Sequence, residues 1–314
     1  MLWARTGREA YDAAVAEVWT LPPVAAGVAL AEAAPALVHA AVLAANGHNT
    51  QPWRFILAPD GIAIRPDFSR RTPVVDPDDH HLYASLGCAA ENLVTAAAAS
   101  GFAAGVEAGP EGVFVHLDPA PPQSSPRAAA IPRRQCVRFD YDGRPVASDE
   151  VAALLAAAGV PGVAGEIFTD RRDIDRITDL VVAGNSVQMG DPAFMAELTQ
   201  WVRFNGHQAA TTRDGLFAGA TGAPEVAAWL GRRLFDVAVS ADGENAKYHR
   251  QLASSAGVMV LVADTDDPAG WIAAGRAAQR FALEATVLDL RYASVNQPVE
   301  VLSVRPDLMR FLGT

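Results

Sequence analysis

Two alanine-rich segments that lie far apart in the sequence match each other without a gap. GCAAENLVTAAAASGF begins at Gly87 and GRAAQRFALEATVLDL begins at Gly275, so the offset is 275 − 87 = 188 residues. Both segments place small residues along one face at helical spacing. Either two alanine-rich helices resemble each other by chance, or one unit has been duplicated within the chain. A duplicated chain would imitate a symmetric dimer.

The composition indicates a globular protein that handles small molecules. Its 314 residues, half of them hydrophobic, are enough for two domains or one large domain. A formal net charge of −11 disfavours nucleic acid and anionic lipid as main partners, because neutralising phosphates needs clustered basic residues. Two cysteines are too few for a disulfide framework or a four-thiolate zinc site. No bilayer-spanning apolar run and no signal peptide stand out, so we expect a cytoplasmic protein.

Hydrophobic spacing and turn residues predict alternating helices and strands. In the first part of the chain the expected elements are helices over 8–20 and 32–45, a hairpin turning at Asp60 and Gly61, and a helix that closes at Gly101. Later the expected elements are helices over 149–158, 171–190 and 223–239, a strand over 257–264, and a long helix from Trp271 to Leu290. The Pro- and Ser-rich segment 121–132 predicts a linker between a first half, 1–120, and a second half, 133–314.

Two polar stretches contain residue types that carry chemistry. In HNTQPWRF, from His48 to Phe55, the amides of Asn49 and Gln51 offer donors and acceptors, while Trp53 is expected to anchor the loop by packing. The second stretch holds metal-ligating residue types, namely Asp76, Asp78, Asp79, His80 and His81. Acids favour the N-terminal end of a helix, and adjacent helical side chains point about 100° apart. We therefore expect a helix start there, and no metal site.

Three motifs together resemble the nitroreductase family of flavin mononucleotide (FMN) proteins: NGHNTQPWRF, LGCAAENLVTAAAASGF and IPRRQCVRF. The family's usual run before a strand is Pro-Ser-x-x-Asn-x-Gln-Pro-Trp, and its opening motif is Arg-x-Ser-x-Arg or Lys. The later segment GRAAQRFALEATVLDLRYASVNQPVE most resembles the internally duplicated, Acg-like branch of the family. The resemblance implies an α+β, nitroreductase-like fold that is internally duplicated into a pseudo-dimer within one chain.

The resemblance also implies one composite FMN site, because each half of the chain carries only one of the two flavin motifs. The residues that it assigns to the flavin are Arg133, Arg134, Cys136 and Arg138 on the phosphate side, and Asn46, His48, Asn49 and Gln51 on the other side. Paired guanidinium groups match the charge and geometry of a phosphate. The chain departs from the family where Cys136 replaces a hydroxyl residue and where Ala45 and Asn46 replace Pro-Ser. No side chain is expected to act as a catalytic acid or base.

The function that the resemblance implies is NAD(P)H-dependent reduction of nitroaromatics or quinones through FMN, with NADH or NADPH as the electron donor. The alternative is a non-catalytic, FMN-sequestering or storage protein of the Acg type, and a third reading is a flavin enzyme of specialised metabolism. The glycine-rich segment 191–224 either covers the site or forms a surface excursion. The expected partners are small molecules, with no nucleic acid and no membrane. The expected assembly is a monomer with an internal pseudo-dimer, and a homodimer of such chains stays open.

Overall fold

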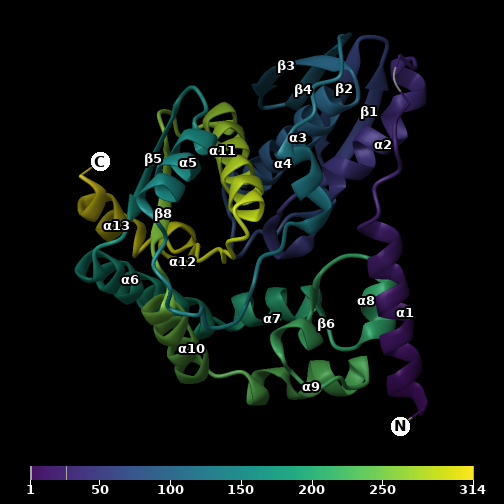
Figure 1. The fold of residues 1–314 in the computed structure, drawn as a ribbon. Coiled ribbons are helices and arrows are strands. Elements are labelled where there is room, and N and C mark those ends of the chain that lie inside the picture. Colours follow the sequence, from purple (N-terminus) through teal and green to yellow (C-terminus); the bar gives the residue numbers. More distant parts are fainter. Residues whose placement is uncertain (1, 26, 314) are drawn as a thin grey trace.

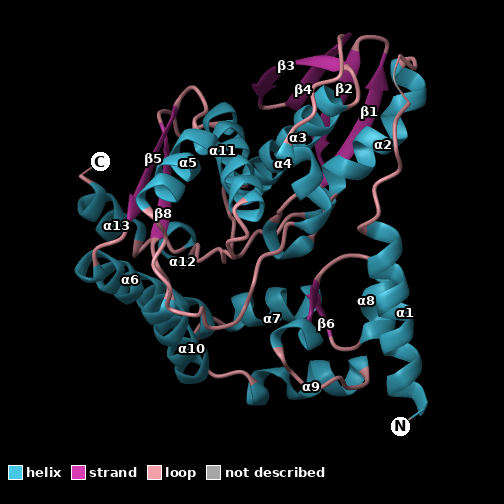
Figure 2. Ribbon diagram, viewed as in Figure 1, coloured by secondary structure: helices cyan, strands magenta, loops and turns pink. Residues whose placement is uncertain are grey.

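The computed structural model describes residues 2–25 and 27–313 and has an α+β fold (Figures 1 and 2). A four-stranded sheet lies on one side of the molecule, and helices form most of the remainder. The α+β class expected from the sequence is therefore confirmed. Within the described residues, no helix combines the length and the apolar character needed to cross a membrane.

The first part of the chain forms the sheet and its cover. Its elements are α1 (Leu2–Val18), α2 (Leu30–Val42), η1 (Gly47–Asn49), β1 (Trp53–Ala58), β2 (Gly61–Pro66), η2 (Phe68–Arg70), α3 (His80–Ala99), β3 (Phe102–Gly109) and β4 (Gly112–Pro119). The strand order is β1-β2-β4-β3, and all neighbours are antiparallel. Helices α2 and α3 cover one face of this sheet, and the core between these layers includes Leu37, Ile62, Leu86 and Val115 (Figure 1).

Local sequence explains the hairpin and the start of α3. Strands β1 and β2 pair with Ala58 opposite Gly61, which leaves a two-residue turn. A Cβ at Gly61 would lie 2.3 Å from the carbonyl oxygen of Val115, so only glycine fits there. The carboxylate of Asp76 accepts the backbone N–H groups of His81 (3.1 Å) and Leu82 (2.9 Å) at the start of α3. These acceptors satisfy N–H groups that a helix start leaves unpaired, as expected for this acidic stretch.

The second part of the chain is mainly helical. Its helices are α4 (Pro126–Ala130), η3 (Ile131–Arg133), α5 (Ser148–Ala158), α6 (Arg171–Met189), α7 (Pro192–Trp201), α8 (Gly206–Thr212), η4 (Ala218–Thr221), α9 (Ala228–Ala238), α10 (Ala241–Ser254), α11 (Pro268–Val287), α12 (Gln297–Glu300) and α13 (Arg305–Leu312). Its strands are β5 (Val163–Phe168), β6 (Val202–Arg203), β7 (Leu216–Phe217) and β8 (Val258–Ala263). Strand β5 pairs antiparallel with β8, and β6 pairs parallel with β7.

Helices α3 and α11 pack against each other at the two glycines that the sequence comparison aligned (Figure 1). A Cβ at Gly87 would lie 2.1 Å from the carbonyl oxygen of Ile272, and a Cβ at Gly275 would lie 1.9 Å from that of Ala84. Each of these carbonyls belongs to the residue three positions before the matching glycine. The backbones therefore approach each other through equivalent positions of the two helices.

The polar contacts between α3 and α11 also join equivalent positions of the two helices. Nε of Arg280 donates to Glu91 at 2.9 Å, and Nε2 of Gln279 donates to Oδ1 of Asn92 at 2.7 Å. At the offset found in the sequence, Glu91 corresponds to Gln279 and Asn92 corresponds to Arg280. The same two positions therefore meet twice with their roles exchanged, as in the contact of a symmetric dimer.

The residues 169–257 lie between β5 and β8 and contain α6 to α10. The ends of this segment are adjacent, because Phe168 pairs with Val258. Helix α8 of the segment packs against α1, where a Cβ at Gly206 would lie 2.5 Å from the carbonyl oxygen of Gly7 (Figure 1). The N-terminal helix therefore packs on this segment.

Most sequence expectations for secondary structure are confirmed within a few residues. The helix expected over 8–20 begins earlier, at Leu2, and the helix expected over 223–239 starts later, at Ala228. Several elements were not expected, among them β5, α7, α8, α10 and α13. The segment 121–132 contains α4 and the start of η3, and Ala130 and Ile131 are buried there. The linker and the division into two halves stay predictions.

Candidate functional site

The loop between α2 and β1 has an unusual backbone. His48, Asn49 and Gln51 adopt positive φ angles of 45°, 52° and 55°. Such angles are uncommon for residues with side chains, and they cluster at functional sites. Oδ1 of Asn46 accepts the Gln51 N–H at 2.9 Å, and Nε2 of Gln51 donates to Oδ1 of Asn49 at 2.8 Å. Three of the four expected loop residues therefore hold one another in this conformation.

The loop is fixed at both ends by buried groups. Trp53 is 8% exposed and belongs to the core beneath the sheet, which agrees with its expected role as a packing anchor. At the other end, the backbone N–H of Ala45 donates to Oε1 of Gln279 on α11 at 3.3 Å. The loop of the first part thus contacts the second part of the chain.

Arg134 joins the two parts at this place. It is 6% exposed, its Nη2 donates to the carbonyl oxygen of Leu43 at 3.0 Å, and its Nη1 donates to the hydroxyl of Tyr292 at 2.6 Å. Its guanidinium also lies over the ring of Trp19. Nε of Arg134 is buried and has no hydrogen-bond partner among the described residues. The guanidinium therefore serves first to hold α2 to the segment after α11.

The other residues of the arginine motif have different surroundings. Nη2 of Arg133 donates to the carbonyl oxygen of Thr286 at 3.0 Å, at the end of α11. Cys136 and Arg138 are exposed. The guanidinium of Arg138 is close enough to His48 for its charge to help lower the imidazole pKa. The charge of Arg138, from the second part, therefore reaches His48, from the first part.

His48 is uncharged at neutral pH. Burial, and then the positive charge of Arg138, lower its pKa to about 4. Its Nδ1 is buried and has no hydrogen-bond partner among the described residues. A neutral imidazole with a free ring nitrogen can accept or donate one hydrogen bond, depending on its tautomer. Among the residues that the structure describes, neither the guanidinium of Arg138 nor Nδ1 of His48 has a hydrogen-bond partner.

The segment 191–224 contacts the loop directly. Nδ2 of Asn49 donates to the carbonyl oxygen of Gly215 at 3.1 Å, and the Gly215 N–H donates to the carbonyl oxygen of Asn49 at 2.9 Å. Next to Gly215, Asp214 pairs with Arg70 and with Nη2 of Arg203 (2.6 Å). Burial and these two arginines act in opposite directions, and the pKa of Asp214 is lowered overall. These contacts, which we call the clasp, hold the segment 191–224 against the loop.

The acidic stretch before α3 brings three potential ligand atoms together. Atoms of Asp76, Asp78 and His80 lie within 4.8 Å of one another. The Asp76 carboxylate already accepts two backbone N–H groups, and Nδ1 of His80 lies 2.5 Å from Asp78. These partners explain the group as the start of α3.

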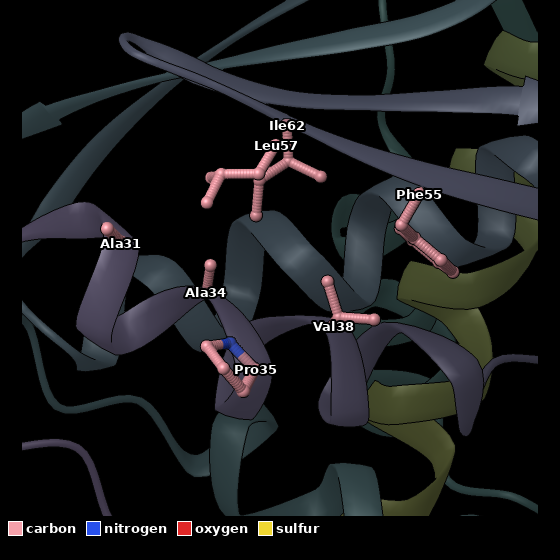
Figure 3. Close-up of a pocket in the computed structure, with 7 residues that line it drawn as sticks. All are labelled: Ala31, Ala34, Pro35, Val38, Phe55, Leu57 and Ile62. Atoms are coloured by element: carbon pink, nitrogen blue, oxygen red, sulfur yellow. The ribbon is translucent and has the colours of Figure 1, made fainter.

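An apolar groove lies elsewhere, between α2 and the β1–β2 hairpin (Figure 3). Its volume is about 300 Å³, and its lining residues are Ala31, Ala34, Pro35, Val38, Phe55, Leu57 and Ile62. Figure 3 shows Leu57 and Ile62 on the strand side and Pro35 on α2. The lining side chains are all apolar, so they offer no partner to a phosphate or a sugar hydroxyl.

Several polar residues at the junction were not found by sequence reasoning. They are Gln188 on α6, Tyr248 on α10, and Gln297 and Glu300 on α12; Glu300 lies 3.4 Å from His81 on α3, which the sequence placed only at a helix start. Oε2 of Glu300 accepts from Nε2 of Gln188 at 2.7 Å, and Nε2 of Gln297 donates to the Tyr248 hydroxyl at 2.6 Å. NQPVE was quoted only as the end of a longer family-like segment, and no local signal marks these residues.

Comparison with known proteins identifies relatives along most of the chain. Two curated proteins of Mycobacterium tuberculosis, from the strains CDC 1551 and H37Rv, each carry the name "Putative NAD(P)H nitroreductase". Each is 29% identical over 301 residues, which cover 88% of this chain and 79% of the relative. No protein-family model matches the chain. A match of this extent includes parts of both halves.

Proposed function

We propose that the chain is an FMN-binding oxidoreductase of the nitroreductase family, of the duplicated, Acg-like kind, because its relatives along most of the chain are named as nitroreductases. The cofactor would lie at the junction between the loop 46–51 and the arginine motif. The observations that carry this proposal are the strained loop 46–51, which is tied to α11 through Ala45 and Gln279, and the charge of Arg138, which acts on His48 from a motif 90 residues away (138 − 48 = 90). The relatives' names favour NADH or NADPH as donor and a nitro compound as acceptor. We propose a nitroaromatic or a quinone as the acceptor.

The residues at the junction suit the phosphate end of FMN. Arg138 is exposed, so its guanidinium is free to form charge-assisted hydrogen bonds to a phosphate. His48 is neutral and carries a buried nitrogen without a partner, which is the kind of group that a ligand satisfies. Arg134 contributes positive charge from behind while its Nη atoms hold Leu43 and Tyr292. Arg133 and Cys136 would line the same side.

When bound, the flavin supplies the chemistry of accepting a hydride and passing electrons on. The chain's own residues bind and orient it. Asn49 and Gln51 are locked to each other in a strained loop, which limits their freedom to move when a ring binds. The two hydrogen bonds between Asn49 and Gly215 hold the segment 191–224 against this side of the loop. No acid or base needs to act in this scheme.

We propose a single composite site in a duplicated chain of two halves, 1–120 and 133–314. The reciprocal contacts of α3 and α11 support the duplication. In the first half, α2 and β1 are separated by residues 43–52, which include the loop, whereas α5 and β5 are separated only by residues 159–162. The short connection leaves no room for an equivalent loop. One flavin per chain is therefore expected.

The test of this function compares FMN with riboflavin, which lacks the phosphate. Purified full-length protein is titrated with each flavin, and the quenching of flavin fluorescence gives the affinity. We expect Arg138→Ala to weaken FMN binding about 10- to 100-fold, from a loss of about 1.5–3 kcal/mol, and to leave riboflavin binding nearly unchanged. The matched control changes the exposed pair Arg232 and Arg233 on α9 to alanine. Failure of the wild type to bind FMN would refute the proposed function.

A second candidate function is a protein that holds FMN without turnover. The contact that favours it is the clasp of the segment 191–224 on Asn49, because a nicotinamide must reach within about 3–3.5 Å of the flavin to deliver hydride. Anaerobic stopped-flow absorbance separates the two functions. Dithionite reduces a covered flavin quickly while NADPH does not, whereas a reductase is bleached by NADH or NADPH at once.

A further inference from the structure

The N-terminal helix α1 has no role in the scheme above, and it is held to the rest of the protein at two places. Along its length it packs on α8, as Figure 1 shows. At its C-terminal end, Nε2 of His39 on α2 lies 2.7 Å from the carbonyl oxygen of Val18, and the ring of Trp19 lies under the guanidinium of Arg134. This end of α1 is therefore fixed to the first part of the chain, beside the arginine motif.

Residues 213–217, which we call the bridging stretch, contact α1 through their side chains. The two Nη atoms of Arg213 donate to the carboxylate of Glu17, at 2.8 and 3.1 Å. The ring centroids of Phe217 and Tyr11 lie 4.4 Å apart. Because Tyr11 and Glu17 are six residues apart, these contacts extend over more than one turn of α1.

The bridging stretch also contacts the loop 46–51 that carries the flavin motif. Two hydrogen bonds, of 2.9 and 3.1 Å, join Gly215 to Asn49. The carboxylate of Asp214 pairs with Arg70 on η2. Arg213, which contacts α1, is only two positions before Gly215, so a movement of the stretch at α1 also disturbs its hydrogen bonds to the loop.

Helix α1 is a peripheral element. Among residues 7–18, whose burial the structure describes, only Gly7 is buried, whereas most of α3 is buried. The side chains of Arg213 and Glu17 are 51% and 65% exposed, and an exposed ion pair contributes little to stability. Elements with few buried contacts open locally at the smallest cost in free energy. We therefore expect α1 to detach more easily than the sheet or α3 unfolds.

We propose that α1 is a strap: while it lies on α8 it holds the bridging stretch against the loop 46–51, and its detachment opens the loop to flavin. The inference rests on the proposed flavin site. The fixed end at Val18 serves as the hinge, so α1 can leave α8 and stay attached to α2. Once α1 has left, the bridging stretch lacks its contacts with Tyr11 and Glu17 and is held by the clasp alone. The equilibrium between attached and detached α1 then sets how fast FMN reaches the loop.

The test locks α1 on α8 with a disulfide. A Cβ at Gly7 would lie 3.7 Å from the Cβ of His207, within the range of about 3.5–4.5 Å that a disulfide needs, so Gly7→Cys is combined with His207→Cys. Stopped-flow flavin fluorescence gives the rate of FMN association with the full-length, flavin-free protein. We expect association to be slower by about tenfold or more in the oxidised form than in the reduced form. The wild type, treated with the same oxidant and reductant, controls for Cys88 and Cys136 and should keep one rate.

A second variant favours the detached state of α1. In Gly206→Ala the new Cβ would start 2.5 Å from the carbonyl oxygen of Gly7, so α1 must move away from α8. FMN association should then be faster. Amide hydrogen exchange of residues 213–217, measured by mass spectrometry without flavin, should be faster by about tenfold. The matched control is Gly109→Ala, where a Cβ meets nothing within 4 Å and both rates should stay at the wild-type values.

The two measurements separate the strap from the flavin site. Equal rates of FMN association in the oxidised and reduced forms of the cysteine pair would overturn the strap and leave the flavin site standing. Unchanged hydrogen exchange of residues 213–217 in Gly206→Ala would also overturn it, because α1 would then not hold the bridging stretch. If the wild type binds no FMN, the proposed function fails and the control of flavin access fails with it.

Discussion

The crossing of α3 and α11 makes Gly275→Ala a sharp test of the fold. The new Cβ would start 1.9 Å from the carbonyl oxygen of Ala84, and ordinary contact begins at 3.4 Å, so the helices must separate locally by 3.4 − 1.9 = 1.5 Å. The contact is backbone against backbone, so no flexible side chain can move aside. Overpacking costs about 1–3 kcal/mol, and we take the upper value of about 3 for a rigid obstacle.

The higher helix propensity of alanine offsets part of this loss in the free energy of unfolding. Alanine is better than glycine in a helix interior by about 1 kcal/mol, which leaves a net loss of about 2 kcal/mol in the free energy of unfolding. Urea denaturation followed by circular dichroism measures this loss as a lower midpoint at an unchanged slope. FMN binding should weaken as well, since Gln279 on α11 holds Ala45, the residue just before the flavin loop.

The control for this experiment is Gly105→Ala on strand β3. A Cβ there meets only the Cβ of His116, at 3.7 Å, which is ordinary contact. We expect this variant to be as stable as the wild type or slightly more stable, because alanine has less chain entropy to lose. Wild-type stability of Gly275→Ala, with a normal denaturation slope, would refute the close approach of the two helices.

Two further predictions concern charged residues. Asp214→Asn removes the carboxylate that pairs with Arg70 and Arg203, so the contact of Gly215 with Asn49 should loosen. NADPH should then bleach the bound flavin faster in stopped-flow absorbance. An unchanged rate would mean that this contact does not limit the access of NADPH to the flavin. Glu300 has a folded-state pKa of about 7, above the ordinary glutamate value of 4.5, so its stabilising contribution is full below about pH 4.5 and is lost as the pH rises through about 7. Glu300→Gln should remove this loss in the free energy of unfolding, which is at most about 3 kcal/mol. Urea denaturation of the wild type and the variant at about pH 5 and about pH 8 measures it. An identical pH dependence in the two proteins would contradict the burial of Glu300.

The sequence predicts best those elements whose signal is local. Helices α3 and α11 have small residues at helical spacing, and Asp60 and Gly61 mark the hairpin between two apolar runs. Helix α10 was missed because ADGENAKYHRQLAS is polar nearly throughout, so no apolar stripe reveals it. Strand β5 was missed because its short sequence, VAGEIF, contains a glycine and shows no clear alternation.

The residues of the candidate site likewise divide into those with a local sequence signal and those without one. Asn49 and Arg138 stand within short motifs with fixed spacing, so a resemblance was enough to select them. The partners of Arg134 could not be selected, because Tyr292 lies 158 residues away in the sequence and meets it only through tertiary packing. The shifted pKa values of Glu300 and His81 could not be predicted from the sequence either, since they arise from burial at the junction and not from neighbours in the sequence.

The position of residues 169–257 between two paired strands also bears on how the chain reaches this structure. Strands β1 and β2 are joined by a two-residue turn, whereas β5 and β8 must close a loop of 257 − 168 = 89 residues. Each doubling of loop length adds about 0.6 kcal/mol of closure entropy, so the longer connection costs about 3 kcal/mol more. Pairs of such high contact order form slowly. During refolding, the first sheet and α3 should therefore gain hydrogen-exchange protection before β5 and β8 do, and α11 should find a preformed surface on which to dock.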